Sequence, residues 1–299
     1  MGHPPSAADR IARHFPPRAL TWRLRTQTLH FGRRPLLMGI VNVTPDSFSD
    51  GGKYFSVQAA CEHACQLVED GADLLDIGGE SSRPYADRIS PEEELHRLLP
   101  VLADIARCTN VPISIDTSKS TVARAAIAAG AEIINDITAL ESDPDMLALA
   151  IETRAGICAM HMQGTPQTMQ DDPQYDAVVE DIHTYLGQRR DTLVQAGIAS
   201  QRICLDPGIG FGKTHAHNLT LMANCWRFHS LGCPLLAGHS RKGFLGKLLG
   251  DKLRDRTSVS VGAALALAAQ GVQILRVHDV RPTREALLAF EASGGTGDF

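Results

Sequence analysis

The sequence lacks a long apolar run and an excess of positive charge. No uninterrupted apolar stretch approaches the roughly 20 residues that a membrane-spanning helix needs, so we expect no membrane partner. The net charge of −5 at pH 7 argues against general nucleic-acid binding, which requires a basic face. This charge still permits an anionic small substrate, because a few nearby cations outweigh distant charges that are screened over roughly 8 Å.

The sequence also lacks an even number of cysteines, as a full set of disulfides would need, and a secretion signal. The seven cysteines are an odd number, and most of them lie in apolar, core-like runs, as Cys158 and Cys204 do. This pattern predicts reduced, buried thiols in a cytoplasmic protein rather than a disulfide framework. The amino terminus has no charged segment followed by an apolar one, as a signal peptide would. Residues 1–19 are instead polar and proline-containing, which predicts a flexible tail.

Eight short apolar runs, rich in Ile, Val or Leu, recur along the chain. Their apolar residues are continuous rather than alternating, which is typical of strands buried on both faces of a parallel sheet. Helical patterns follow most of these runs. The runs cover residues 36–43, 74–78, 113–116, 133–137, 156–160, 203–206, 235–238 and 274–278.

Eight strand–helix units in about 260 residues predict a (β/α)8 TIM barrel. Residues 20–31 alternate enough to predict an N-terminal β-hairpin that closes the barrel floor. No linker or change of composition divides the chain, so residues 20–299 are predicted to form one domain. An open doubly wound sheet is the alternative architecture, but it would use fewer strands, about five or six.

Three helix starts are readable in the sequence. Ser90 and Pro91, followed by Glu93, have the form of an N-cap, a first-turn proline and a capping-box glutamate. The pair at residues 143–144 predicts the start of a second helix. Residues 118–129, followed by a glycine, predict a third.

Polar residues follow the predicted strands at their carboxyl ends, where a parallel barrel builds its active site. Asp116, Asn135 and Asp206 offer carboxylate and amide groups that suit a flat heterocycle with several N–H donors. Two of them also have structural alternatives. Asp116 would serve equally as a helix cap, and Asp206, which precedes a proline, as part of a turn.

A second group of strand-end residues carries donors and positive charge. Lys242, Arg276 and His278 supply what a bound phosphate or pyrophosphate requires, although Arg276 also suits an ion pair within the barrel. Asn42 offers a neutral oxygen that suits Mg2+ beside substrate phosphates. The segment at residues 212–214 resembles the end of a nucleotide-binding phosphate loop, but Pro207 stands where that loop needs a glycine.

Long stretches of the chain, from about residue 20 to residue 292, resemble the dihydropteroate synthases, the folate-pathway enzymes that sulfonamide drugs inhibit. The motifs follow the order of that family and are long and specific. They are MGIVNVTPDSFSDGG at 38–52, DIGGESSRP at 76–84, SIDTSK at 114–119, INDI at 134–137, MHMQG at 160–164, DPGIGFGK at 206–213, SRK at 240–242 and RVHD at 276–279.

The resemblance implies a transferase that condenses 6-hydroxymethyl-7,8-dihydropterin pyrophosphate with p-aminobenzoate, giving 7,8-dihydropteroate and pyrophosphate. It also implies a role for each group of matching residues. The pterin is expected at Asp116, Asn135, Asp206 and Lys242, the pyrophosphate and Mg2+ at Asn42, Arg276 and His278, and p-aminobenzoate at Ser82, Arg83, Pro84 and Phe211. Met160 is a further expected substrate-binding residue. Phe48 and Asp50 are expected on a mobile loop above the site, and the expected catalytic residues are Asp116, Lys242, Arg276, His278 and Asp50.

The chain departs from the family pattern at Gly243, where many relatives carry a serine that reaches the p-aminobenzoate carboxylate. Backbone N–H groups at a helix start are a substitute for that hydroxyl.

Relatives also imply a homodimer through the late helices, near residues 258–269. Two other functions fit the same barrel, a pterin-binding paralogue without catalysis and a methyltetrahydrofolate-dependent methyltransferase. The retained pyrophosphate-binding residues argue against both.

Overall fold

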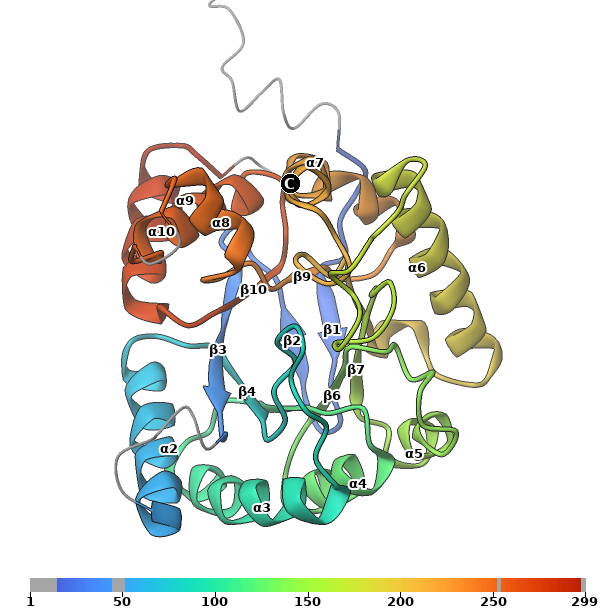
Figure 1. The fold of residues 1–299 in the computed structure, drawn as a ribbon, viewed down its shortest axis with the longest axis vertical. Helices are drawn as coiled ribbons and strands as arrows, with labels where there is room; N and C mark the ends of the chain where they lie inside the picture. The colour runs from blue at the N-terminus through green and yellow to red at the C-terminus, as the bar shows by residue number, and fades with distance from the viewer. Residues whose placement is uncertain (1–14, 45–51, 252–253, 297–299) are drawn as a thin grey trace, which may run out of the picture.

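The computed structural model describes residues 15–44, 52–251 and 254–296. Within these ranges, eight parallel strands form one sheet in the order β8-β7-β6-β5-β4-β3-β10-β9. A bridge between Leu205 and Leu235 joins the two outer strands, and the Leu205 N–H donates to the Pro234 carbonyl at 2.9 Å. The sheet therefore closes into a barrel surrounded by helices (Figure 1), and the predicted (β/α)8 fold is confirmed.

The strands coincide with the predicted apolar runs. All five residues of β4 and of β7 are buried, as continuous apolarity predicts for strands covered on both faces. The strands of the barrel are β3 (Leu36–Asn42), β4 (Leu74–Gly78), β5 (Ile113–Asp116), β6 (Ile133–Asp136), β7 (Gly156–Met160), β8 (Ile203–Asp206), β9 (Leu236–Ala237) and β10 (Ile274–Val277).

Helices connect these strands on the outside of the barrel (Figure 1). The predicted cap of α3 is confirmed, because the Ser90 side chain accepts from the Glu93 N–H at 3.2 Å. The α-helices are α2 (Gly52–Glu69), α3 (Pro91–Cys108), α4 (Ser120–Ala128), α5 (Met146–Thr153), α6 (Val178–Gln195), α7 (His215–Ala223), α8 (Gly243–Leu248), α9 (Thr257–Ala268) and α10 (Val280–Ala292), and the 3-10 helices are η2 (Ser200–Arg202) and η3 (Cys225–Leu231).

The other two predicted helices are present but begin two or three residues later than predicted. The Asp143 carboxylate serves both helices, because Oδ2 accepts from the Ser120 N–H of α4 at 2.7 Å and Oδ1 accepts from the Asp145 N–H, just before α5, at 3.0 Å. Helix α5 begins later, at Met146. Lys119 has an extended backbone, which delays the start of α4 to Ser120.

The hairpin of β1 (Thr21–Arg23) and β2 (Thr28–His30) covers the amino-terminal end of the barrel, as predicted. Trp22 and Leu24 are fully buried there, against apolar residues from the starts of the barrel strands. The Trp22 indole N–H donates to the Arg202 carbonyl at 2.9 Å, and an Arg202 guanidinium N–H donates to the Leu24 carbonyl at 2.8 Å. The carboxyl-terminal mouth is left for a site.

Part of the predicted tail packs on the barrel. The Phe15 ring stacks on Trp226 with ring centroids 5.3 Å apart, and Arg18 is buried. Packing therefore begins before the predicted boundary at residue 20, while residues 1–14 lie outside the described residues.

The seven cysteines are all free. Among the described helices, none has the length and apolarity to cross a membrane.

Candidate active site

The predicted site residues come from separate strands and meet at the carboxyl-terminal mouth. Asn42, Asp116, Met160 and Asp206 are the last residues of β3, β5, β7 and β8, and Asn135 and Arg276 lie close to the ends of β6 and β10. The remaining predicted residues, Ser82, Arg83, Pro84, Phe211, Lys242 and His278, lie in the segments that follow β4, β8, β9 and β10.

Arg276 binds two carboxylates at the centre of the mouth. Its Nε donates to Asp76 Oδ2 at 2.5 Å, and its Nη2 donates to Asp116 Oδ2 at 2.7 Å. Burial alone would lower the pKa of Arg276, but Asp76 and Asp116 outweigh burial and raise it, so the guanidinium stays charged. The ion-pair alternative for Arg276 is therefore what the structure shows. Nη1 makes no hydrogen bond with any described residue and is left to donate to a ligand.

Asp76 belongs to the candidate site but was not among the site residues predicted from the sequence. It is fully buried, and its Oδ2 also accepts from Asn135 Nδ2 at 3.1 Å. Its other oxygen, Oδ1, is buried and has no partner. The sequence did carry a signal, because a carboxylate inside a strand buried on both faces is costly unless it is paired.

Asp116 does not cap a helix, because Asp143 takes that role at α4. Burial raises the pKa of Asp116 to about 7, against the lowering effect of Arg276 and with a further raising effect of Asp76. Near neutral pH this carboxyl group can therefore accept or donate a proton in contact with a ligand.

Asp206 takes part in a turn, as the structural alternative expected. Its Oδ1 accepts from the Gly208 N–H at 2.7 Å. Oδ2 makes no hydrogen bond within the described part of the chain, so it can face a ligand. Burial raises the pKa of Asp206, and the nearby Lys242 opposes this effect.

Lys242 lies beside both Asp206 and Arg276. Its Nζ donates to the Ile209 carbonyl and lies 4.3 Å from the centroid of the Phe211 ring. A Cβ added at Gly238 would lie 3.8 Å from Arg276 Cδ and 3.9 Å from Lys242 Nζ, so both side chains approach the same glycine. Burial lowers the pKa of Lys242 to about 7, although Asp206 opposes the shift.

His278 differs from the expectation that it would bring positive charge. Burial and then Arg276 lower its pKa to about 3, so the imidazole is neutral near pH 7. Its Nδ1 lies 3.1 Å from Ser240 Oγ. His278 therefore offers a neutral N–H donor, and its predicted contact with a pyrophosphate stays a prediction.

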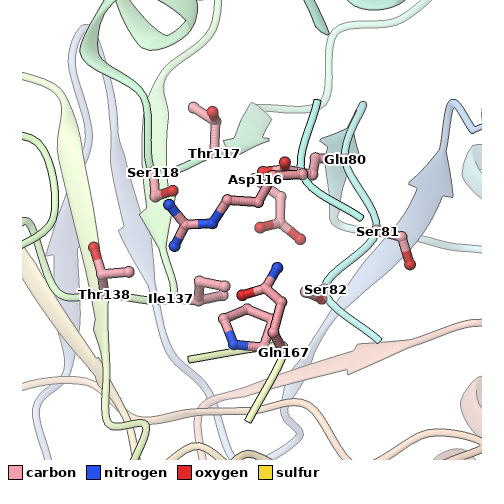
Figure 2. A pocket seen from close by; sticks show the side chains of 11 residues that line it. Glu80, Ser81, Ser82, Asp116, Thr117, Ser118, Ile137, Thr138 and Gln167 are labelled. Carbon is pink, nitrogen blue, oxygen red and sulfur yellow. The ribbon is translucent and has the colours of Figure 1, made fainter. Parts of the chain in front are cut away.

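A pocket opens at the mouth between the segments that follow β4, β5, β6 and β7. Ser82 and Asp116 are the two predicted residues in its wall, and Figure 2 shows them with Gln167 around the hollow. The pocket is lined by Glu80, Ser81, Ser82, Arg88, Asp116, Thr117, Ser118, Ile137, Thr138, Pro166 and Gln167. Its two carboxylates are already paired, Asp116 with Arg276 and Glu80 with Lys119 at 3.1 Å.

The remaining predicted residues take no part in the ion pairs and pocket described above. Arg83 and Pro84 are exposed, and Asn42 is half-buried at the end of β3. Phe48 and Asp50 lie outside the described residues, and so does most of the predicted loop above the site. The roles of these residues stay predictions.

The strand-end carboxylates, the amide and the paired cations define a barrel enzyme built for a flat polar heterocycle, and the pterin-binding enzyme family matches residues 38–278. The dihydropteroate synthase of Escherichia coli (strain K12) is 48% identical over 259 residues, 87% of this chain and 92% of that protein. The chain belongs to the dihydropteroate synthase family.

Solved structures of dihydropteroate synthases are also similar to this chain. One is Xanthomonas albilineans dihydropteroate synthase with 4-aminobenzoic acid, at a TM-score of 0.86 and 45% identity, covering 92% of this chain and 98% of that one. Another is the enzyme of the same organism in complex with 7,8-dihydropteroate, at a TM-score of 0.82 and 43% identity, with the same coverage.

Proposed function

We propose that the chain condenses 6-hydroxymethyl-7,8-dihydropterin pyrophosphate with p-aminobenzoate to form 7,8-dihydropteroate and pyrophosphate. The bond between the pterin methylene and the pyrophosphate oxygen breaks, the arylamine nitrogen bonds to the methylene, and that nitrogen loses a proton. The observation that carries the proposal is the meeting of Asp116, Arg276 and Lys242 at one barrel mouth in a chain of this family.

The pterin ring is proposed to lie on the strand-end acceptors. Its N–H groups would donate to Asp116 and to Asp206 Oδ2, whose burial is costly unless a ligand or a cation pairs with it. Asn135 has its Nδ2 engaged with Asp76, so its Oδ1 remains as an acceptor for the same ring. Met160, buried at the end of β7, would pack against the ring.

Catalysis is proposed to rest on fixed charges rather than on a protein nucleophile. As the pyrophosphate leaves, negative charge grows on its oxygens, and Arg276 is held in its charged form beside them. Lys242 adds a second cation, and His278 adds a neutral N–H. Positive charge on the pterin methylene would be stabilised by the Asp116 carboxylate, with Asp50 as a further proposed contributor. Groups ordered before the reaction need no reorganisation in the transition state.

Mg2+ is proposed to bind at Asn42. Among the described residues, no cluster of three His, Cys, Asp or Glu side chains could hold a metal ion. The chain thus suits a cation that takes most of its ligands from water and from substrate phosphates, as Mg2+ does, with the Asn42 amide oxygen as a protein ligand. When bound, Mg2+ supplies charge neutralisation for the pyrophosphate.

Replacing Asn42 by Ala should therefore raise the Mg2+ concentration needed for half-maximal turnover by about tenfold. Calorimetric titration of the protein with pyrophosphate in the presence of Mg2+ gives a readout independent of turnover and should weaken likewise. A chelator should abolish activity until Mg2+ is added back. Full activity in the chelator would contradict the metal requirement.

The overall function is tested with purified protein and both substrates, by following dihydropteroate and pyrophosphate formation. Tight binding of the pterin pyrophosphate without any product would favour the non-catalytic paralogue. Methyl transfer from methyltetrahydrofolate in place of condensation would favour the methyltransferase.

Asp206→Ala should weaken pterin pyrophosphate binding by about tenfold or more, even without p-aminobenzoate, because it removes a charged hydrogen-bond acceptor. Calorimetry measures this affinity directly. Asp191→Ala, at a surface aspartate that pairs with Arg190, is the matched control and should bind as the wild type does. If Asp206→Ala changed only the affinity for p-aminobenzoate, the proposed position of the pterin would be wrong.

The arylamine is proposed to lie above the pterin, bordered by Ser82, Arg83, Pro84 and Phe211. Gly243 begins α8 directly after Lys242, which supports a role for its backbone N–H in place of a serine hydroxyl at the carboxylate.

We also propose a cytoplasmic homodimer that associates through α9. Leu288 on the neighbouring α10 is an exposed large apolar side chain that such an interface would cover.

A further inference from the structure

Four consecutive carbonyl oxygens in the loop after β8 each accept a hydrogen bond from a different side chain. This loop, residues 207–212, carries Phe211. The Ile209 carbonyl accepts from Lys242 Nζ, that of Gly210 from Gln170 Nε2 at 2.9 Å, that of Phe211 from Lys213 Nζ at 2.8 Å, and that of Gly212 from the Tyr175 hydroxyl at 2.8 Å.

The two lysines approach neighbouring parts of this loop. Gly208 and Gly210 have φ of 70° and 87°, a left-handed backbone that turns successive carbonyls in different directions. A Cβ at Gly208 would lie 3.3 Å from Lys213 Nζ, and a Cβ at Gly210 would lie 3.4 Å from Lys242 Nζ. The closest contacts would be with the His161 carbonyl oxygen, which a Cβ at Gly208 would overlap, and with Lys242 Cδ, 2.6 Å from a Cβ at Gly210. The glycines therefore let the loop pack against the end of β7 and against the Lys242 side chain of the candidate active site.

Lys213 is among the largest fully buried side chains, and it forms no ion pair with any described carboxylate. Its Nζ instead lies 3.1 Å from His161 Nδ1, at the end of β7. Burial and then Lys213 lower the pKa of His161 to about 3, so the imidazole is neutral and its Nδ1 accepts from Lys213. Burial lowers the pKa of Lys213 well below its usual value, and Asp206 opposes this shift. The acceptors that stabilise the buried amine are His161 Nδ1 and the Phe211 carbonyl oxygen.

These contacts connect Lys213 to the active site through one residue. Lys213 fixes the Phe211 carbonyl to the end of β7, and the Phe211 ring lies against Lys242. We propose that Lys213 is a positioning residue that sets the Phe211 ring at the height where it forms one wall of the p-aminobenzoate slot. The inference rests on the proposed function and gives a role to His161 and Lys213, which lie in two motifs with no other assignment for these side chains.

The test replaces Lys213 by Met, which keeps most of the side-chain volume and removes the donors. The KM for p-aminobenzoate should rise by about tenfold, because the slot wall moves. The KM for the pterin pyrophosphate should change by less than about twofold, because Asp116 and Asn135 lie on strands whose positions the barrel ladder sets. Lys247→Met, at an exposed lysine of α8, should leave both constants unchanged.

Tyr175→Phe is a second, milder variant that removes only the donor to Gly212. It should raise the KM for p-aminobenzoate by about threefold and spare that for the pterin pyrophosphate. If Lys213→Met does not fold, Tyr175→Phe tests the proposal by the same comparison, a raised KM for p-aminobenzoate beside an unchanged KM for the pterin pyrophosphate. Equal increases in both constants, a fall in kcat alone, or unchanged p-aminobenzoate kinetics would overturn the positioning role. Absence of product with the wild-type protein would instead contradict the proposed function.

Discussion

Lys242→Ala should lower kcat/KM by roughly 10²–10³-fold, the usual loss when one preorganised donor is removed from an electrostatic site. The reason is its position, since its Nζ and the Arg276 side chain both approach Gly238 in the candidate active site. A cation removed there leaves the departing pyrophosphate with one fewer positive neighbour and exposes the face of the Phe211 ring. Steady-state kinetics with both substrates measure the effect.

Stability separates this loss from unfolding. Burial lowers the pKa of Lys242, so the folded protein disfavours its charged form, and removal of the ammonium should not destabilise the fold through lost charge. The free energy of unfolding should fall by no more than about 1 kcal/mol. Lys247→Ala on the exposed side of α8 is the control and should retain wild-type kinetics. A Lys242→Ala protein with unchanged kcat/KM would remove this residue from the site.

Arg276→Met should affect both stability and turnover. The change leaves Asp76 buried with no cation beside it, and breaking such a pair on one side costs about 3–5 kcal/mol. It also removes the charged group proposed to meet the pyrophosphate, so turnover should be lost. Denaturant unfolding gives the first quantity and product formation the second.

A double variant distinguishes the two roles of Arg276. Arg276→Met with Asp76→Asn removes the charges of that pair and leaves Asp116 without its cation. Because the pKa of Asp116 is already raised to about 7, this carboxyl group can take up a proton, so the double variant should recover much of the lost stability but stay inactive. The control, Arg284→Met, breaks a partly exposed pair with Asp73 at 3.8 Å and should cost less than about 1 kcal/mol. A fully stable single variant would show that Asp76 does not depend on Arg276, and an active double variant would contradict the catalytic role.

The barrel was readable in the sequence because its strands are buried on both faces, which leaves continuous apolar runs at residues such as 74–78 and 156–160. The position of the candidate site could be predicted because the carboxyl ends of parallel strands meet at one end of a barrel, whatever their side chains are. The pairing of Arg276 with Asp76 could not be predicted, since 200 positions separate them and no local pattern records the contact. The neutral state of His278 likewise depends on burial, which only the folded chain has.

Local sequence rules failed where a distant side chain intervened. Asp143 accepts from the Asp145 N–H before α5, but its other carboxylate oxygen accepts from the Ser120 N–H of α4, a contact that no local pattern predicts. Lys213 was examined as part of a phosphate loop, which the glycine spacing excluded, and it ends the family motif at residues 206–213, but neither pattern predicted a role for its side chain. Its contact with His161 spans 52 positions, so its place in the core follows from the fold rather than from its neighbours in sequence.

The hairpin under the barrel has a consequence for the order of events. With Trp22 and Leu24 filling one end, reactants and products share the opposite entrance. The groups proposed to hold the bicyclic ring lie at strand termini, deeper than the loop residues proposed to border the aromatic amine. From these proposed positions we expect the pterin pyrophosphate to bind before p-aminobenzoate, because an amine bound first would block its path. We also expect the product to leave before the next cycle begins.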